Sequence, residues 1–423
     1  MTFAPTIGLI AEYNPFHNGH VYQLAKLREL HPDAAIVVIM SGSFTQRGGA
    51  AIADKWTRAA WAVRGGADLV LELPYAFACR SAEHFASGGV QCLAGLGCID
   101  ALAFGAEAEH IEPLEKASAC MDDDTLQAAV HERIQNGASY AVAMSGEVTK
   151  RTGVAPEVLR APNNILGMEY LRAMRKFAPE MKAVLVQRVG ADYHDTDIHG
   201  SFASASAIRA ALESPAPSQR EPEIALQHVM PENCLAALMA ALPDRLPRQS
   251  FLLRPLLSRL LLDAASLSAV CGMGEGLEHR LLSMAQMARS WEGLIGAIAT
   301  RRYPRSRIAR LLVHVLTGFT AEAAAAFDAT GPRYLRVLAM NARGARLLHR
   351  AKKTARLPII TKTSQFLKSK DMLRTWEDLT PLQQMLLYDV RATELRELSL
   401  ASKGTYCRDF LTSPYVVRAS CEK

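Results

Sequence analysis

The stretch that decides the fold is Ile7-Gly8-Leu9-Ile10-Ala11-Glu12-Tyr13-Asn14-Pro15-Phe16-His17-Asn18-Gly19-His20, close to the start of the chain. Its first part belongs to an apolar run, Thr6–Ala11, which predicts a buried strand. Asn14-Pro15 predicts a turn, because a residue before proline favours extended backbone and ends regular structure. An amphipathic pattern over Gly19–Leu30 then predicts a helix. The expected order is strand, turn and helix N-terminus.

This order places His17 and His20 where an anion would bind. A helix N-terminus offers unpaired N–H groups and a partial positive charge. Gly19 lets the backbone approach a ligand closely, and two imidazoles three residues apart can face the same group. Attack at the α-phosphate of ATP needs positioning and donors aimed at the phosphate oxygens. We therefore predict that His17 and His20 are catalytic; the alternatives are surface histidines or a metal-binding pair.

In the rest of the first half, apolar runs typical of buried strands alternate with amphipathic segments typical of helices. This alternation predicts an α/β fold with a doubly wound, Rossmann-like parallel sheet. In such sheets ligands bind beyond the carboxyl ends of the strands. The further predicted strands are Ala34–Met40, Asp68–Leu73, Ala101–Gly105 and Lys182–Gln187, and the predicted helices are Asp54–Arg64 and Ser81–Leu96, with Asp54 and Ser81 as N-caps.

The character of the chain changes after Arg209. Residues 214–224 are rich in Pro, Ser and charge and are typical of a linker. We therefore expect a catalytic domain over residues 1–213 and a mainly helical domain over 225–423. The helices expected in the second domain are Gln249–Ala265, Leu277–Thr300, Arg305–Leu316, Leu335–Ala351 and Pro381–Glu394.

The charge of the chain is divided unevenly between its halves. The 423 residues carry a net charge of +6, yet residues 1–210 hold 18 Lys and Arg against 23 Asp and Glu, a net −5. The remaining residues hold 30 against 19, a net +11. A basic half is typical of a nucleic-acid partner, although a solvated basic surface is the alternative. The candidate contacts to RNA are Arg47, after the second strand, and Arg301, Arg302 and Arg305.

Several classes of protein are disfavoured. The eight cysteines form no C-x-x-C pair, so we expect no thiolate zinc site and no other metal held by the protein alone. Met1–Pro5 lacks the basic residues of a secretory signal, and no apolar stretch is long enough to cross a membrane. We therefore expect a cytoplasmic protein.

Other ligand contacts follow from position. Gly105 ends a predicted strand where adenosine would lie and would let the base approach, although an ordinary turn glycine is the alternative. Ser206 and Arg209 begin a helix and predict a second anion site. Asn163 and Asn164 follow a proline, and helix capping is the simplest interpretation of that pair.

The strand with His17-Asn18-Gly19-His20 resembles the signature of nucleotidyltransferases and class I tRNA synthetases. Within that superfamily, Glu12–His20 closely resembles the bacterial tRNA(Met) cytidine acetate ligase family. The chain departs from the family at Gly49-Ala50, where Glu-Pro is usual. Further segments resemble the family in the same order: Met40–Gly48, Ala67–Pro74, Phe104–Glu107, Pro162–Gly167, Ser204–Arg209 and, more loosely, Arg301–Tyr303.

The resemblance implies a two-step reaction. ATP and acetate give acetyl-adenylate and pyrophosphate, with Mg²⁺ accompanying the phosphates. The acetyl group then passes to the wobble cytidine of elongator tRNA(Met), giving N4-acetylcytidine. The rival interpretations are a small-molecule adenylyltransferase of the phosphopantetheine or mononucleotide type and a non-catalytic RNA-binding protein. The ATP-binding residues so implied are Ile10, Ala11, Glu12, Tyr13, Asn14, Pro15, Phe16, His17, Asn18, Gly19, His20, Gly105, Asn163, Arg188, Ser206 and Arg209.

Overall fold

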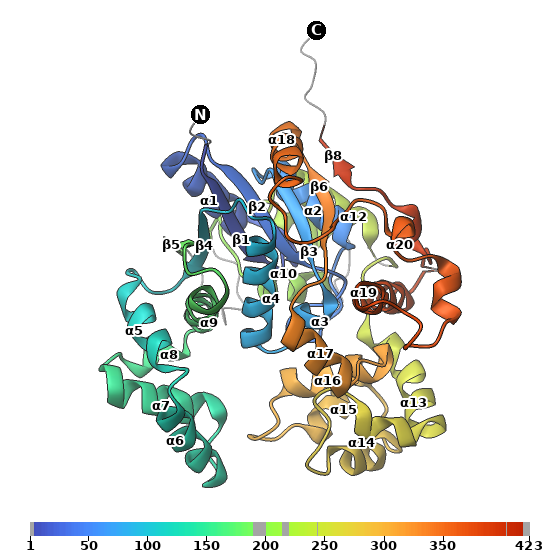
Figure 1. Cartoon of the computed structure of the whole chain (residues 1–423). Coiled ribbons are helices and arrows are strands. Elements are labelled where there is room, and N and C mark those ends of the chain that lie inside the picture. Colours follow the sequence, from blue (N-terminus) through green and yellow to red (C-terminus); the bar gives the residue numbers. More distant parts are fainter. Residues whose placement is uncertain (1–3, 189–199, 214–219, 243, 403, 418–423) are drawn as a thin grey trace.

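The computed structural model describes residues 4–188, 200–213, 220–242, 244–402 and 404–417. Its centre is one mixed sheet, which contains eight strands among these residues, in the order β5-β4-β1-β2-β3-β6-β7, with β8 paired to β6 (Figure 1). The strands are β1 (Thr6–Ala11), β2 (Ala35–Ser41), β3 (Leu69–Leu73), β4 (Ala101–Ala106), β5 (Lys182–Gln187), β6 (Leu335–Met340), β7 (Ile359–Ile360) and β8 (Tyr415–Val416).

The first five strands confirm the predicted parallel sheet. β1 lies between β2 and β4, and its register runs from Thr6 opposite Ala35 to Ala11 opposite Met40. Because the strands are parallel, their carboxyl ends meet at one edge of the sheet. The helices of this half are α1 (Asn18–Leu30), α2 (Lys55–Arg64), α3 (Tyr75–Ala78), α4 (Ala82–Gly95), α5 (Glu112–Cys120), α6 (Asp124–Gln135), α7 (Tyr140–Thr152), α8 (Pro156–Arg160), α9 (Pro162–Phe177) and α10 (Ala205–Glu213).

The second half is mostly helical. Two groups of helices lie below the sheet in Figure 1, α5–α8 of the first half and α13–α17 of the second half. The α-helices of this half are α11 (Arg220–Leu226), α12 (Glu232–Ala241), α13 (Leu253–Leu262), α14 (Leu277–Ala285), α15 (Trp291–Ile298), α16 (Arg305–Thr317), α17 (Ala321–Thr330), α18 (Ala342–Ala351), α19 (Pro381–Leu398) and α20 (Arg408–Leu411). The 3-10 turns are η1 (Gln249–Leu252), η2 (Ala264–Ala269), η3 (Thr363–Gln365) and η4 (Ser369–Leu373).

The second half also returns to the sheet. β6 pairs antiparallel with β3, with Leu69 opposite Met340, and β7 and β8 pair with β6. The predicted helix over Leu335–Ala351 is therefore wrong for its first part, which is strand β6. Without β6, β3 would present an unpaired edge, and an apolar run that reaches such an edge gains a ladder of hydrogen bonds there. The sheet thus continues across the boundary expected at residues 214–224.

Other boundaries differ in detail. Residues 220–224 of the expected linker lie within helix α11, while residues 214–219 lie outside the described part. Asp54 caps α2 as predicted, with its side chain accepting from the Thr57 N–H. Ser81 occupies the N-cap position of α4, but its hydroxyl bonds to His84 at 2.7 Å instead of to the helix backbone.

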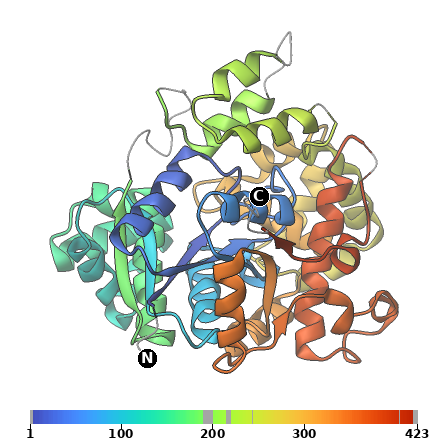
Figure 2. The same ribbon diagram turned by 90° about the horizontal axis from the view of Figure 1, so that it is seen from above.

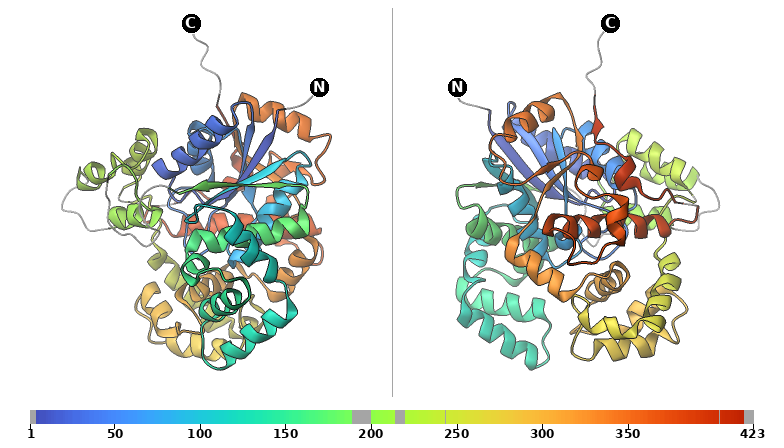
Figure 3. Two further views of the ribbon diagram at one scale, coloured as in Figure 1. Left: turned by 90° about the vertical axis from the view of Figure 1, so that its left-hand side faces the viewer. Right: turned by 45° about the vertical axis from the view of Figure 1, so that its right-hand side comes forward.

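Helices cover both faces of the sheet, as the views from above and from the sides show (Figures 2 and 3). Two apolar cores lie between the sheet and these helices. One core joins β1 and β2 to α1, α2, α10 and α12 and includes Leu24 and Trp61. The other joins the sheet to α4, α9 and the helices of the second half and includes Phe104 and Tyr170. Burial on both faces explains why the strand sequences are almost continuously apolar.

Candidate functional site

The turn between β1 and α1 brings both histidines to the carboxyl edge of the sheet. β1 ends at Ala11 and α1 begins at Asn18, with His17 in extended backbone as its N-cap. The Nδ1 atom of His17 accepts from the Gly19 N–H at 3.1 Å. The Nδ1 atom of His20 accepts from the His17 N–H at 3.2 Å. Each imidazole therefore accepts a hydrogen bond from one backbone N–H group at the start of the helix.

These contacts define which ring nitrogen carries the proton. A neutral imidazole has one donor and one acceptor nitrogen. Because Nδ1 accepts in both rings, Nε2 of His17 and of His20 is the N–H donor. The ring centroids lie 3.8 Å apart, so the pair offers two donors within a small volume.

The environment keeps both rings neutral. Burial, followed by the charges of Arg188 and Arg209, lowers the pKa of His17 from 6.5 to about 3. Burial, followed by His17 and Arg188, lowers the pKa of His20 well below its ordinary value. The positive potential that disfavours a second proton is the potential that favours a polyphosphate.

The two histidines lie in the wall of a cavity of about 1280 Å³. Most of the predicted ATP contacts also line it, although Pro15, Phe16 and Asn18 do not. Phe16 is fully buried, with its ring 5.0 Å from that of Tyr13. Asn18 donates to the carbonyls of Ser201 and His228, so it ties α1 to the later chain. The predicted contacts that line the cavity are Ile10, Ala11, Glu12, Tyr13, Asn14, His17, Gly19, His20, Gly105, Asn163, Arg188, Ser206 and Arg209.

The two arginines differ in how they are held. Arg209 donates to the Asn14 carbonyl at 2.6 Å and to the Ser206 hydroxyl at 3.3 Å, so it is fixed beside the turn. The exposed guanidinium of Arg188 makes no hydrogen bond to a residue within the described ranges. A Cβ built on Gly105 would lie 3.4 Å from Arg188 Cγ, which puts Gly105 and Arg188 on the same wall.

The structure separates the roles of Asn163 and Asn164. Asn163 lines the cavity and donates to Glu107 Oε1 at 2.6 Å. Asn164 is buried, and its Oδ1 accepts from the N–H groups of Glu107 and Ala108, both at 3.0 Å. Its Nδ2 donates to the Val158 carbonyl. All of these atoms are occupied, so Asn164 is structural and only Asn163 faces the cavity.

The loop that follows β2 also lines the cavity. Buried Arg58 donates to the carbonyls of Glu12 and Ser41, so the loops after β1 and β2 share one cation. Gly48 has a φ of +81°, and a Cβ there would lie 2.6 Å from the backbone nitrogen of Arg310 in α16. Only glycine fits this position, because both the backbone conformation and the space exclude a side chain.

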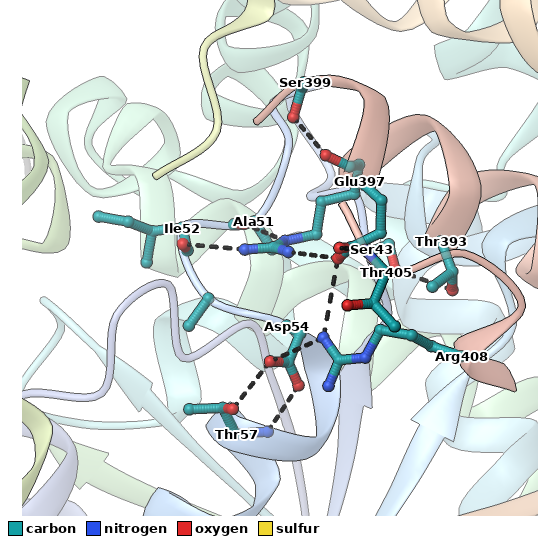
Figure 4. A network of polar contacts seen from close by, with 12 residues as sticks. Ser43, Ala51, Ile52, Asp54, Thr57, Thr393, Glu397, Ser399, Thr405 and Arg408 are labelled. Carbon is teal, nitrogen blue, oxygen red and sulfur yellow. Dashed lines mark hydrogen bonds and ion pairs between the residues drawn. The ribbon is translucent and has the colours of Figure 1, made fainter. Parts of the chain in front are cut away.

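Helix α19, in the second half of the chain, holds the loop after β2 through hydrogen bonds (Figure 4). Buried Arg396 donates to the carbonyls of Ala51 and Ile52 at 2.8 and 3.1 Å. Its neighbour Glu397 accepts from Arg396 at 2.9 Å and lies 3.7 Å from Arg408, which also pairs with Asp54. The cavity wall therefore depends on residues more than 340 positions away in sequence.

The second half completes the cavity, and sequence reasoning missed most of these residues. They occur in short stretches, such as 246–250 and 290–292, that match no binding motif, so no sequence signal distinguishes them. Of the arginines predicted to contact RNA, Arg47 and Arg305 line the cavity, while Arg301 and Arg302 do not. The missed lining residues include Gln23, Gln46, Arg248, Gln249, Trp291, Glu292 and Ser306.

The Glu72-Leu73-Pro74 segment has a structural role. Glu72 and Asp409 are buried and flank Lys55 Nζ, at 2.7 Å each. Arg336 of β6 pairs with Glu72 at 3.1 Å. Charges buried this deeply are tolerated only when paired, so this cluster joins β3, α2, β6 and α20.

No group of three or more His, Cys, Asp or Glu side chains in the described ranges could hold a metal ion. Among the helices described, none is both long enough and apolar enough to cross a membrane.

Comparisons with known proteins agree with this geometry. The HIGH nucleotidyl transferase model matches residues 4–408. The tRNA(Met) cytidine acetate ligase of Syntrophotalea carbinolica is 37% identical, over 98% of this chain and 99% of that protein. The protein of that name from Acetivibrio thermocellus is 34% identical, over 92% and 94%.

Two crystal structures of Thermotoga maritima TmcAL are similar along the whole chain. The apo structure has a TM-score of 0.87 at 30% identity and covers 98% of this chain and 100% of that one. The structure bound with alpha-thio ATP has a TM-score of 0.85 at 30% identity, with the same coverage. The chain therefore belongs to the HIGH nucleotidyl transferase family and, within it, to the tRNA(Met) cytidine acetate ligases.

Proposed function

We propose that this chain activates acetate with ATP and transfers the acetyl group to the wobble cytidine of elongator tRNA(Met). The observation that carries the proposal is the pair of Nε2–H donors of His17 and His20, set beside Arg188 and Arg209 in one cavity. The names of the relatives and the ATP analogue bound to TmcAL support it.

In the first step, an acetate oxygen attacks the α-phosphorus of ATP and pyrophosphate leaves. The acetate carboxylate is itself the nucleophile, so the protein needs no nucleophilic side chain. The Nε2–H groups of His17 and His20 donate to the α-phosphate oxygens as negative charge builds on them. Arg209 holds the departing pyrophosphate. Mg²⁺ would arrive with the nucleotide, held by phosphate oxygens and water rather than by a protein cage.

The nucleotide occupies the α1 side of the cavity in this proposal. The adenosine lies against Gly105, with Asn163 and Arg188 as contacts. The segment Ile10–His20 forms the wall beside the triphosphate, and Ser206 and Arg209 stand at the start of α10. Pro15, Phe16 and Asn18 support this wall from behind, because Phe16 is buried and Asn18 bonds to the later chain.

In the second step the wobble cytidine enters the same cavity and yields N4-acetylcytidine. The second half carries the net charge of +11 and would hold the tRNA through its phosphates in the cytoplasm. Arg47 and Arg305, which line the cavity, are the first contacts that we propose. The cytidine must leave its stack in the anticodon loop to reach the adenylate.

The decisive experiment supplies labelled acetate, ATP and tRNA in stages to the purified chain. We expect acetate-dependent exchange of pyrophosphate into ATP without tRNA, and labelled N4-acetylcytidine once tRNA(Met) is added. Exchange that depends on phosphopantetheine or a mononucleotide would favour a small-molecule adenylyltransferase. Binding of tRNA with no exchange for any acid would favour a non-catalytic RNA-binding protein.

A further inference from the structure

Glu12 follows β1 directly and offers one carboxylate oxygen to the cavity. Its Oε1 accepts from the Gln46 backbone N–H at 2.6 Å. Its Oε2 accepts no hydrogen bond from any residue in the part of the chain that the structure describes. The side chain is half-buried and lines the cavity. One oxygen therefore joins two loops, and the other is available to a ligand.

The Glu12 carboxylate lines the cavity together with a group of apolar and aromatic side chains. Ile10, Phe85, Phe104 and Tyr170 belong to the core on the α4 and α9 face, and all four line the cavity. Glu12 and Tyr170 both line the cavity, and burial, followed by the Glu12 charge, raises the pKa of the Tyr170 phenol. The nearest neighbours of Gly105 are instead Arg188 and Gln23 of α1.

The charge of Glu12 is unsuited to a triphosphate. Its backbone belongs to the segment that we assign to ATP, but a carboxylate repels phosphate oxygens. The other acidic side chains in the lining are Glu292, which pairs with Arg305, and exposed Glu213. When a ligand displaces water from this half-buried wall, the free carboxylate oxygen keeps a hydrogen bond only if the ligand brings a donor.

The acceptor base provides that donor. The exocyclic amine of cytosine presents two N–H groups, and a Glu carboxylate is a recognised acceptor for them. Unstacked bases are held against aromatic side chains, and the rings of Phe104 and Tyr170 lie 5.7 Å apart in this wall. Neither acetate nor the phosphate chain of ATP offers an N–H group.

We propose that Glu12 binds the N4 amine of the acceptor cytidine and accepts its proton during acetyl transfer, an inference that rests on the proposed function. The N4 lone pair forms the new bond to the acetyl carbonyl carbon. The bond from that carbon to the adenylate oxygen breaks, and AMP leaves with the electron pair. One N4 proton moves to Glu12 Oε2 and is later released to water. No oxidant, reductant or further reactant is needed.

The test separates the two half-reactions in the full-length chain. Adenylate formation is measured as acetate-dependent pyrophosphate exchange, and transfer as a single turnover of preformed enzyme-bound acetyl-adenylate mixed with tRNA(Met). Glu12→Gln keeps an oxygen for the Gln46 N–H but removes the base. We expect it to slow transfer by on the order of 10²–10⁴-fold, the usual contribution of a general base, and to slow exchange far less.

Two further variants make the result specific. Glu12→Asp keeps the carboxylate but withdraws it by one methylene, so we expect a transfer rate between those of the parent and of Glu12→Gln. Glu213→Gln removes a negative charge from the cavity rim, and we expect neither half-reaction to change appreciably. Thermal melts of all variants check that the fold is kept.

Three outcomes would overturn the assignment of Glu12. They are unchanged transfer in Glu12→Gln, an equal fall in both half-reactions, and a raised Mg²⁺ requirement for exchange, which would mark Glu12 as a metal contact. A parent chain that performs neither half-reaction would instead overturn the proposed function, and this inference with it.

Discussion

The imidazole of His20 lies over that of His17, with 3.8 Å between the ring centroids, and accepts the backbone N–H of the same His17. The contact is a capping arrangement in which histidines replace the usual hydroxyl and carboxylate side chains. It aligns both Nε2–H groups as donors without the need for a positive charge on either ring. The same hydrogen bonds that begin helix α1 therefore prepare the proposed α-phosphate site.

Removal of either imidazole should abolish adenylate formation. Each lost donor to the developing charge costs on the order of 10²–10³ in rate. We therefore expect the rate of acetate-dependent pyrophosphate exchange to fall by that factor in His17→Ala and in His20→Ala. His31→Ala, at the C-cap of the same helix, is the matched control. Near-normal exchange in either variant would remove the two histidines from the mechanism.

Substitution of Arg188 or Asn163 should weaken the binding of ATP and leave the binding of tRNA unchanged. Arg188 and Asn163 line the cavity, and neither belongs to the apolar cores. We expect Arg188→Ala and Asn163→Ala to weaken ATP binding in calorimetry while tRNA affinity stays at the parent value. Unchanged ATP affinity in both variants would show that the nucleotide lies elsewhere in the cavity.

Asn164→Ala should behave in the opposite way to Asn163→Ala. Asn164 bonds to three backbone groups and does not face the cavity. The free energy of unfolding should fall by about 1–3 kcal/mol for each polar group left unpaired. ATP affinity, measured at a temperature where the variant is folded, should stay close to that of the parent. A variant with parent stability and weakened ATP binding would reverse these assignments.

The fold should lose stability in acid because of His17. Its pKa is about 3 in the fold and 6.5 in the unfolded chain, so the unfolded state binds more protons between these values. Stability is therefore fully present above pH 6.5 and declines as the pH falls, by at most about 1.4 kcal/mol per pH unit from this group.

Urea unfolding of the parent and of His17→Asn at several pH values measures this slope. Asn is also a good N-cap residue, so helix α1 keeps its cap. We expect a shallower acid decline in His17→Asn, with His31→Asn matching the parent. Equal slopes in all three proteins would mean that His17 titrates normally in the fold.

Binding of tRNA should depend on salt and on a subset of the basic residues of the second half. The log of affinity should fall with log salt by roughly 0.7–0.9 per phosphate contact. Within helix α16, Arg310 donates to the Gln46 carbonyl and supports the loop after β2, whereas Arg305 lies at the cavity. We therefore expect Arg305→Glu to weaken tRNA binding and lower the salt slope, with pyrophosphate exchange retained.

Arg346→Glu makes the same charge change on helix α18, at the opposite end of the molecule from α16 (Figure 1). Its tRNA affinity should stay near that of the parent. If Arg301→Glu, Arg302→Glu and Arg305→Glu all bind tRNA normally, this segment is an ordinary solvated surface. If exchange falls together with tRNA binding, the second half also serves adenylate formation.

Local sequence patterns were sufficient for the five strands of the first half, for helices α1, α2 and α4, and for the turn that carries His17 and His20, whereas helices α3 and α5–α8 were not predicted. The five predicted strands match β1 to β5, and Asp54 caps α2 as expected. These features depend on contacts between near neighbours, such as apolar periodicity, a proline turn and a cap, which a short segment carries within itself. The resemblance found in Glu12–His20 is confirmed by relatives that match along almost the whole chain.

Tertiary structure decided the rest, because the same local pattern allowed more than one outcome. Leu335–Met340 is apolar enough for a buried helix or a strand, and the open edge of β3 selected the strand. Asn163 and Asn164 are chemically identical, and only packing turns one to the cavity and buries the other. The wall built by Arg396 on the carbonyls of Ala51 and Ile52 joins distant segments. The sequence alone thus determined the turn that carries His17 and His20, whereas long-range packing determined the cavity around it.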